Sequence, residues 1–354
     1  MRSPPSIQFG TFHRVAGIDR KQGVVMKRIV ASVVAVLALS VGSASAADLK
    51  LARKAPAVVE APSPWDFAFG AALMSDYVFR GITQSNHKAS VAAYFEPRYN
   101  INKDLQLYVG VSGESISFPN RAASEIDIYG GIRPTFGALA LDLGFWYYDY
   151  PGGQCFNAAF PPGTDCFNNG NLPLNGNVVK ANVSFWEVYF KPTWNVNDQL
   201  ALGATVFYTP SFLNSGAPGT YVSGTAKYTF AGTPFWPGIG TYISGEFGRQ
   251  FLGTSDAFYG CPGCVPPSPN GINYADYDTW NFGIGFTAKV FTLDLRYSDT
   301  NLSKGDCNAF TSDHTATQTG FVTAINPAPG FGSNWCGATF IAKFSADLTL
   351  TSLK

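Results

Sequence analysis

The sequence has 354 residues, of which 46% are hydrophobic, 15% aromatic and only 14% charged, and its 24 basic side chains balance its 24 acidic ones. This composition fits an ordinary soluble enzyme poorly and is too apolar for a disordered chain, while the balanced charge argues against a basic nucleic-acid-binding protein. No apolar run reaches the roughly 18–20 residues of a membrane-spanning helix, which excludes a helical membrane protein.

Residues 26–46 carry the features of an export signal in the expected order. A short basic start precedes an apolar stretch, residues 29–41, that is too short to cross a bilayer, and an A-x-A cleavage site ends at Ala46. We therefore predict a signal peptide at 26–46 and an exported protein that resides where disulfides can form.

Composition also assigns the regions on either side of the signal peptide. Residues 1–25 show neither signal character nor periodicity, so we expect an upstream extension that is not part of the native protein. Residues 47–64 are rich in Pro and Ala and lack a strand pattern, which predicts a periplasmic tether. The folded domain is expected to occupy residues 65–354.

From Trp65 onward, apolar and polar residues alternate with a period of two, the pattern of a strand with two different faces. Twelve such segments of about ten residues can be counted, which is the length that a tilted membrane strand requires. The clear segments are 65–73, 105–114, 125–133, 141–148, 186–191, 200–206, 280–289, 291–297 and 340–347, and the weaker ones are 90–99, 221–230 and 239–248.

The charged residues of these segments fall on the face opposite to the aliphatic residues. A soluble sandwich would also have one polar face, but we would expect more charge on it. A charged side chain facing lipid costs about 2–4 kcal/mol at mid-depth, which explains why none shares the aliphatic face there. We therefore predict an all-β fold, a closed antiparallel up-and-down transmembrane barrel with a charged lumen. The candidate lumen residues are Glu96, Arg98, Glu114, Asp127, Arg133, Asp142, Glu187, Lys191, Glu246, Lys289, Asp294 and Arg296.

The connections between the predicted strands alternate in length. Links after odd-numbered strands are long, as at 151–180 and 299–337, whereas links after even-numbered strands are mostly tight, as at 137–139. This is typical of outer-membrane barrels, which have short periplasmic turns and long external loops. Aromatic residues should mark both interfaces. Tyr99, Phe136 and Trp194 are predicted for the inner girdle, and Tyr77, Phe79, Tyr147, Tyr150, Tyr208 and Trp280 for the outer one.

All six cysteines lie in long links, two in each of three links: Cys155 and Cys166, Cys261 and Cys264, Cys307 and Cys336. Six cysteines allow 15 pairings, and their locations favour one local bridge per link. The C-x-x-C sequence at 261–264 could also be a redox or zinc motif, but its link contains no histidine and no second pair, which favours a structural bridge.

The segment Ser75-Asp76-Tyr77-Val78-Phe79-Arg80-Gly81-Ile82-Thr83-Gln84-Ser85 is expected to continue the first predicted strand. Its pattern S-D-Y-x-x-R-G-x-x-Q-S resembles the Gcw_chp family, the TorF-family porins, and the similarity extends over roughly residues 65–350. The resemblance implies a barrel in the bacterial outer membrane, surrounded by lipid and lipopolysaccharide and inserted by the barrel-insertion machinery. Asp76 and Arg80 share a parity, so we expect them to form a salt bridge at the rim.

The predicted inner face has many glycines and charges of both signs, which favours a narrow passage. We therefore expect a channel for passive diffusion of small polar solutes with at most a weak cation preference. The alternative is that opposite charges pair across a closed interior, leaving a structural or adhesin-like barrel that acts through its external loops.

An outer-membrane hydrolase would need a nucleophile beside a histidine. Downstream of the predicted signal peptide, the only histidines are His87 and His314, both expected to be solvated residues of external loops. No G-x-S-x-G, H-E-x-x-H or P-loop motif occurs. We expect no enzymatic activity, no catalytic residue, no cofactor, no metal and no nucleic-acid partner.

Overall fold

The computed structural model describes residues 64–157, 166, 175 and 177–350, which belong to one compact unit, residues 62–354. The expectations for the upstream extension 1–25, for the signal peptide 26–46 and for all but the last residue of the tether lie outside the described residues.

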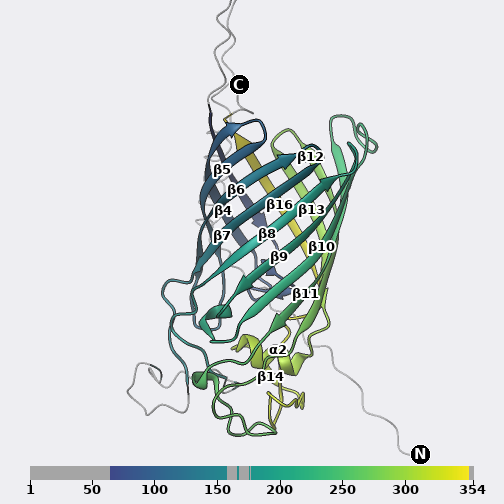
Figure 1. The fold of residues 1–354 in the computed structure, drawn as a ribbon. Coiled ribbons are helices and arrows are strands. Elements are labelled where there is room, and N and C mark those ends of the chain that lie inside the picture. The colour runs from purple at the N-terminus through teal and green to yellow at the C-terminus, as the bar shows by residue number, and fades with distance from the viewer. Residues whose placement is uncertain (1–63, 158–165, 167–174, 176, 351–354) are drawn as a thin grey trace, which may run out of the picture. The chain divides into compact units, whose positions relative to one another are not determined.

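Twelve strands form one closed antiparallel barrel in which each strand pairs with its neighbours in chain order (Figure 1). The last strand closes the barrel on the first, with Gly70 opposite Asp347. The predicted fold class is confirmed, and the three weaker segments are full strands. The strands are β1 (Trp65–Met74), β4 (Ser90–Asn102), β5 (Leu105–Ser115), β6 (Ser124–Phe136), β7 (Leu139–Asp149), β8 (Phe185–Asn195), β9 (Leu200–Thr209), β10 (Gly219–Thr229), β11 (Gly240–Leu252), β12 (Tyr277–Ala288), β13 (Phe291–Thr300) and β16 (Thr339–Thr349).

The links between barrel strands fall into two groups at opposite ends of the barrel (Figure 1). Short turns occupy one end, and the long links gather at the other, which we call the link end. Among the described residues, no helix is long and apolar enough to cross a bilayer. The long links carry β2 (Val78–Phe79), β3 (Ile82–Thr83), η2 (Phe212–Asn214), η3 (Ala257–Tyr259), α2 (Lys304–Thr311), β14 (Thr317–Gln318) and β15 (Phe331–Gly332).

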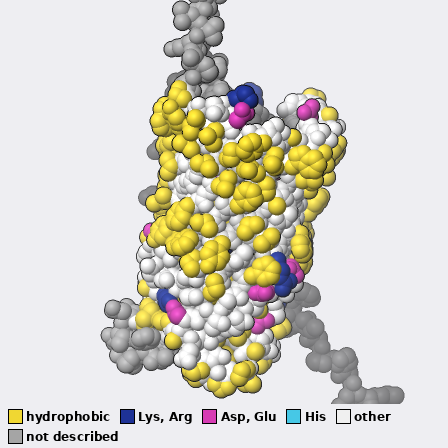
Figure 2. All heavy atoms as spheres, in the orientation of Figure 1, with side chains coloured by type: hydrophobic (Ala, Val, Ile, Leu, Met, Phe, Trp, Pro, Cys, Tyr) yellow, Lys and Arg dark blue, Asp and Glu magenta, His cyan; other side chains and the backbone are white. Residues whose placement is uncertain are grey.

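The two faces of the barrel wall have the polarity that a bilayer demands. In β6, Ile128 is 54% exposed, whereas its neighbour Asp127 is only 3% exposed. The same inversion recurs in β8, where Val188 is exposed and Glu187 is buried. On the face shown in Figure 2, hydrophobic side chains spread over the strands, and the few charged ones lie mostly toward the two ends. Because lipid rather than water solvates such a surface, the apolar side chains can face outward.

Aromatic side chains mark the end of the barrel that carries the short turns. Phe136 and Trp194 are 64% and 53% exposed on the outer surface, just before two of these turns. The predicted outer girdle is partly wrong, because Tyr77, Phe79 and Tyr150 pack against the buried cluster of the long links instead of facing outward. Tyr77 and Phe79 lie in the first link, residues 75–89, which folds inward, whereas Tyr150 directly follows β7 and is itself a member of that cluster.

A hydrophobic core lies at the link end, in a cap made by the long links. Phe118, Phe156, Leu302 and Trp335 come from three different links and are all buried in one cluster, together with strand ends such as Phe185. Three disulfides reinforce the cap, and each joins the two cysteines of one link: Cys155–Cys166, Cys261–Cys264 and Cys307–Cys336.

Candidate functional site: the charged lumen and its inward hairpin

Eleven of the twelve candidate lumen residues lie on the inner face of the barrel, where they line hollows or bond to side chains that line them. Lys289 is the exception and a correction. The β12–β13 register pairs Ala288 with Phe291, so Lys289 belongs to a two-residue turn, where it is exposed with a φ of 55°. The strand and its alternation end at Ala288, one residue before Lys289.

Three hollows open inside the barrel. The β1-side hollow has about 360 Å³ and is lined by Tyr94, Glu96, Glu114, Lys343 and Asp347, among others. The turn-side hollow has about 300 Å³ and is lined by Gln106, Arg133, Asp142 and Lys191, among others. The hairpin-side hollow has about 350 Å³ and is lined by Arg80, Tyr221, Glu246 and Arg296, among others. The interior is therefore not packed like the core of a small closed barrel.

One network of paired charges runs along the wall formed by β4 to β7. Glu96 accepts hydrogen bonds from Arg98 Nε at 2.6 Å and from Arg133 Nη1 at 2.8 Å. Arg133 also reaches Asp142 at 3.2 Å, and its guanidinium lies 3.5 Å from the centre of the Tyr108 ring. These charges neutralise one another side by side along the wall, which leaves the space in front of them free.

A second network joins β11, β12 and β13. Arg296 pairs with Asp294 at 3.0 Å and donates further hydrogen bonds to Asn281 and Ser244. Tyr242 donates to the same aspartate at 2.8 Å. Each network is held by neighbouring strands, so the positions of its charges follow directly from the strand register.

Some inner charges have no oppositely charged partner within 4.0 Å in the described part of the chain. The ammonium of Lys191 lies 4.3 Å and 4.7 Å from the ring centres of Tyr189 and Phe207, where cation–π attraction replaces an ion pair. Glu246 accepts a hydrogen bond from the neutral Tyr221 hydroxyl at 2.9 Å. Such groups remain available to a passing polar solute.

The first link forms a hairpin, β2 and β3, whose tip reaches into the barrel. The tip consists of Arg80 and Gly81, with φ values of 49° and 79°. A Cβ on Gly81 would lie 2.5 Å from Oγ1 of Thr279 in β12, so only glycine fits this close approach to the wall. Arg80 pairs with Glu187 of β8 at 2.6 Å and donates to Gln250 of β11 at 3.0 Å.

The expected rim pair between Asp76 and Arg80 is therefore wrong. Asp76 lies at the base of the hairpin, where it accepts from Thr83 at 2.5 Å and Ser85 at 2.9 Å and contacts His87 Nδ1 at 2.7 Å. Arg80 lies at the tip. The tight turn between them reverses the chain, so a shared parity no longer means a shared position. His87 is likewise bound to Asp76 and not simply solvated.

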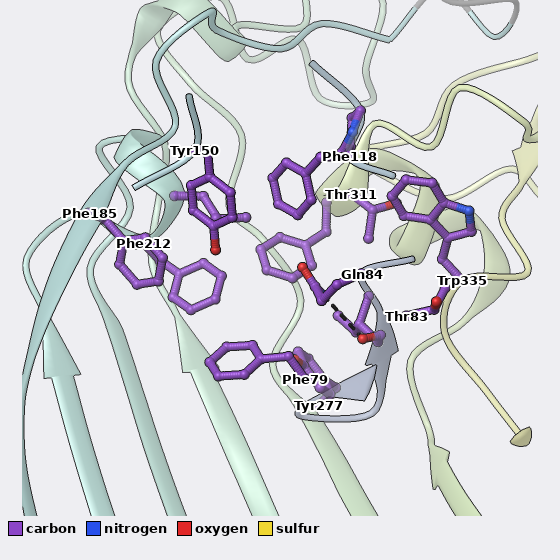
Figure 3. Close-up of a pocket in the computed structure, with 14 residues that line it drawn as sticks. Phe79, Thr83, Gln84, Phe118, Tyr150, Phe185, Phe212, Tyr277, Thr311 and Trp335 are labelled. Carbon is purple, nitrogen blue, oxygen red and sulfur yellow. Dashed lines mark hydrogen bonds between the residues drawn. The ribbon is translucent and has the colours of Figure 1, made fainter. Parts of the chain in front are cut away.

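The hairpin and the cap pack against each other around a small apolar pocket (Figure 3). Phe79 and Gln84 enter it from the first link, and Phe118, Phe212 and Trp335 enter from other links. The Gln84 amide donates to the Ile82 carbonyl at 3.1 Å. The pocket has about 30 Å³, room for about two water molecules. The link end is thus closed here by apolar packing.

Glu125 and Tyr77 were not among the residues predicted to form a site. The Tyr77 hydroxyl donates to Glu125 at 2.9 Å, beside the predicted lumen residues Glu114 and Asp127. Glu125 could have been found, since it lies two positions before Asp127 and therefore shares its face. No signal in the sequence placed Tyr77 there, because its position depends on the fold of the link.

The family model described as "Bacterial protein of unknown function (Gcw_chp)" matches residues 58–234. No curated protein matches the sequence. Among solved structures, the KdgM porin in complex with disordered oligogalacturonate is 8% identical, with 80% of this chain and 97% of that chain covered at a TM-score of 0.35. The NanC porin is 7% identical, with coverages of 80% and 98% and a TM-score of 0.37. The Pseudomonas putida toluene transporter TodX is 9% identical, with coverages of 82% and 88% and a TM-score of 0.36.

Proposed function

We propose that this chain, which belongs to the Gcw_chp family, forms a narrow channel in the bacterial outer membrane for passive diffusion of small polar solutes. The observation that carries the proposal is the inner wall, where charged and polar side chains line three hollows of about 300 to 360 Å³. A barrel that served only as a scaffold would have no need of so much unfilled, charged interior. Lipid and lipopolysaccharide would surround the barrel, and the barrel-insertion machinery would place it there.

The inward hairpin would set the width of this channel. Its tip lies between the hairpin-side hollow and the cap, and the Arg80–Glu187 pair holds it against the wall. Release of the hairpin would widen the path toward the external medium. Among the candidate lumen residues that face inward, seven are acidic and four are basic, which supports a weak preference for cations.

Recordings from purified protein in planar lipid bilayers test the channel. We expect small conductance steps, a reversal potential of the cation-selective sign in a KCl gradient, and larger steps from Arg80→Ala. Lys289→Ala, a change in the exposed turn between β12 and β13 at the other end of the barrel, is the matched control and should leave the steps unchanged. Absence of steps from both the wild type and Arg80→Ala would overturn the proposal. The proposal assigns the chain no enzymatic activity.

The packed cap favours a second candidate, a closed structural or adhesin-like barrel that acts through its external links. Diffusion through a channel does not require a disulfide-bonded cap with its own hydrophobic core, whereas a rigid cap is suited to binding another surface. Shaving the links with protease separates the two functions. A channel should keep conducting afterwards, whereas an adhesin should stop binding to its target surface.

A further inference from the structure

Three carboxylates meet on the inner wall near the link end. Glu114 lies in β5, and Glu125 and Asp127 lie in β6. The register places Glu114 directly opposite Glu125 and Asp127 opposite Ser112. Oxygen atoms of the three carboxylates all lie within 4.8 Å of one another. Like charges directly opposite each other on paired strands destabilise a sheet, so this arrangement calls for a positive charge between them.

No ion pair in the described part of the chain supplies such a charge. None of the three carboxylates pairs with a basic group within 4.0 Å, and the donors close to them are neutral, namely hydroxyls and the indole of Trp146. Tyr77 donates to Glu125 at 2.9 Å, and Ser112 donates to Asp127 Oδ2 at 3.1 Å. Lys343 lines the same hollow as Glu114 but forms no ion pair with it. Elsewhere on the inner wall, by contrast, Glu96, Asp142, Glu187 and Asp294 all have an arginine partner.

A second observation points to a missing ligand. Asp127 is 3% exposed, and no donor meets its Oδ1 with hydrogen-bond geometry, although the unpartnered indole of Trp146 lies close by. Oε2 of Glu114 is also buried and unpartnered. Glu125 is 2% exposed. Buried carboxylate oxygens are normally satisfied, because an unpaired buried charge is costly. These oxygens belong to the same cluster, so a single cation could satisfy them together.

We propose that Glu114, Glu125 and Asp127 bind one divalent cation of the calcium type. Calcium takes oxygen ligands at roughly 2.3–2.6 Å, so ligands on opposite sides of the ion lie about 4.8 Å apart. Magnesium demands a more regular octahedron, which three carboxylates from two rigid strands do not offer as readily. The oxygens of the cluster all lie within 4.8 Å of one another, close enough for one calcium ion to bind all three.

The surroundings provide an entry path and a connection to the hairpin. Glu114 and Ser112 line the β1-side hollow, through which an ion can reach the cluster. Tyr77 belongs to the first link and lies directly before β2, the first strand of the hairpin. Its hydrogen bond to Glu125 therefore ties the base of the hairpin to the cation site. Ion binding would order both together.

Isothermal titration calorimetry of the full-length barrel in detergent, stripped with EDTA and titrated with CaCl₂, tests the site. We expect one bound Ca²⁺ per chain. Asp127→Asn should lower the Ca²⁺ affinity at least about tenfold, since even mutation of residues that only hydrogen-bond to metal ligands lowers metal affinity by that much. Glu246→Gln is the matched control, because Glu246 is an inner-wall carboxylate bonded to a tyrosine outside the cluster. It should bind Ca²⁺ as the wild type does.

Melting temperatures provide a second readout that does not depend on heats of binding. Without Ca²⁺, Glu125→Gln should have a higher melting temperature than the wild type, because the repulsion among the three carboxylates is reduced. With Ca²⁺ present, the wild type should have the higher melting temperature. No binding to the wild type up to about 10 mM, beyond the range of extracellular calcium modules, would overturn the proposal. Tighter binding of MgCl₂ than of CaCl₂, or an equal loss of affinity in Glu246→Gln, would also contradict it.

Discussion

Arg80 Nη2 lies 2.6 Å from Glu187 Oε2, and this ion pair joins two residues that are 107 positions apart in the sequence. Arg80 Nη1 meets the other carboxylate oxygen at 2.9 Å, so the contact is bidentate. The two side chains are 5% and 1% exposed. A buried bidentate pair fixes the geometry of its partners, and here it fixes the hairpin tip against β8.

Removal of only one member of this pair should be far more costly than removal of both. Arg80→Met leaves the Glu187 carboxylate buried without a counter-charge, which typically destabilises a protein by about 3–5 kcal/mol. Arg80→Met with Glu187→Met replaces the pair by apolar side chains and should recover most of that loss. Urea unfolding in detergent, followed by tryptophan fluorescence, measures both. Equal losses in the single and double variants would show that the pair does not hold the hairpin.

His87 should make the contact between two links depend on pH. Its Nδ1 lies 2.7 Å from Asp76 Oδ2, and its Nε2 lies 2.8 Å from the carbonyl oxygen of Asn334. Both partners accept hydrogen bonds, and an imidazole donates from both nitrogens only when it is protonated. The hydrogen bond to Asp76, aided by that to Asn334, raises the pKa of His87 above its ordinary value against the opposing effect of burial.

Because the pKa is raised in the folded protein, the stabilisation by His87 is fully present below about pH 6.5, the ordinary value of histidine. It is lost as the pH rises through the higher folded-state pKa. We therefore expect proteolysis of links 75–89 and 301–338 to be slower at pH 6 than at pH 9, and His87→Gln to remove the difference. Burial lowers the pKa of His314, so that residue acts in the opposite direction. The His314→Gln variant should still be cut more slowly at pH 6 than at pH 9. Loss of this difference in His314→Gln would contradict the assignment of the pH dependence to His87.

The strands could be predicted because parity alone decides which way a strand residue points. Ile128 faces outward and Asp127 inward for that reason. Parity no longer predicts the direction of a side chain where the chain turns. Lys289 lies in a turn, and Arg80 lies at the tip of a hairpin whose partner Glu187 is on a distant strand. The acidic cluster depends in the same way on the register of two strands, which the spacing of carboxylates along the sequence does not give.

The longest link should depend most on its disulfide. Cys307 and Cys336 are 29 positions apart, whereas Cys261 and Cys264 are 3 apart. In the chain-entropy model, a bridge stabilises more as the closed loop lengthens, by about 3–4 kcal/mol for the first pair and less than 2 kcal/mol for the second. Cys307→Ala with Cys336→Ala should therefore expose link 301–338 to protease while the strands stay protected. Mass spectrometry of the fragments shows which segment is cut. Faster cleavage in the variant that lacks Cys261–Cys264 than in the one that lacks Cys307–Cys336 would contradict the expected order of the two disulfides.

Glycines on the inner face make room for tyrosines of the neighbouring strand. A Cβ on Gly110 in β5 would lie 2.3 Å from Cζ of Tyr129 in β6, whereas a Cβ on Gly224 in β10 would meet nothing within 4 Å. Gly110→Ala should cost about 1–3 kcal/mol through overpacking. Gly224→Ala should cost nothing measurable. Urea midpoints in detergent test this, and equal midpoints for the two variants would show that the tyrosine is free to move aside.

The outward direction of the aliphatic face can be tested at Ile128, which is 54% exposed near the middle of β6. Ile128→Arg places a charge where acyl chains should be, and an arginine at the bilayer midplane costs about 2–4 kcal/mol. Val322→Arg is the matched control, because Val322 is 56% exposed but lies in link 301–338. Folding into lipid vesicles, followed by the shift in gel mobility between folded and unfolded barrel, should be impaired only in Ile128→Arg. If both variants folded equally well into vesicles, the exposed aliphatic side chains would not be facing lipid, and the inner position of the charged residues would need another cause.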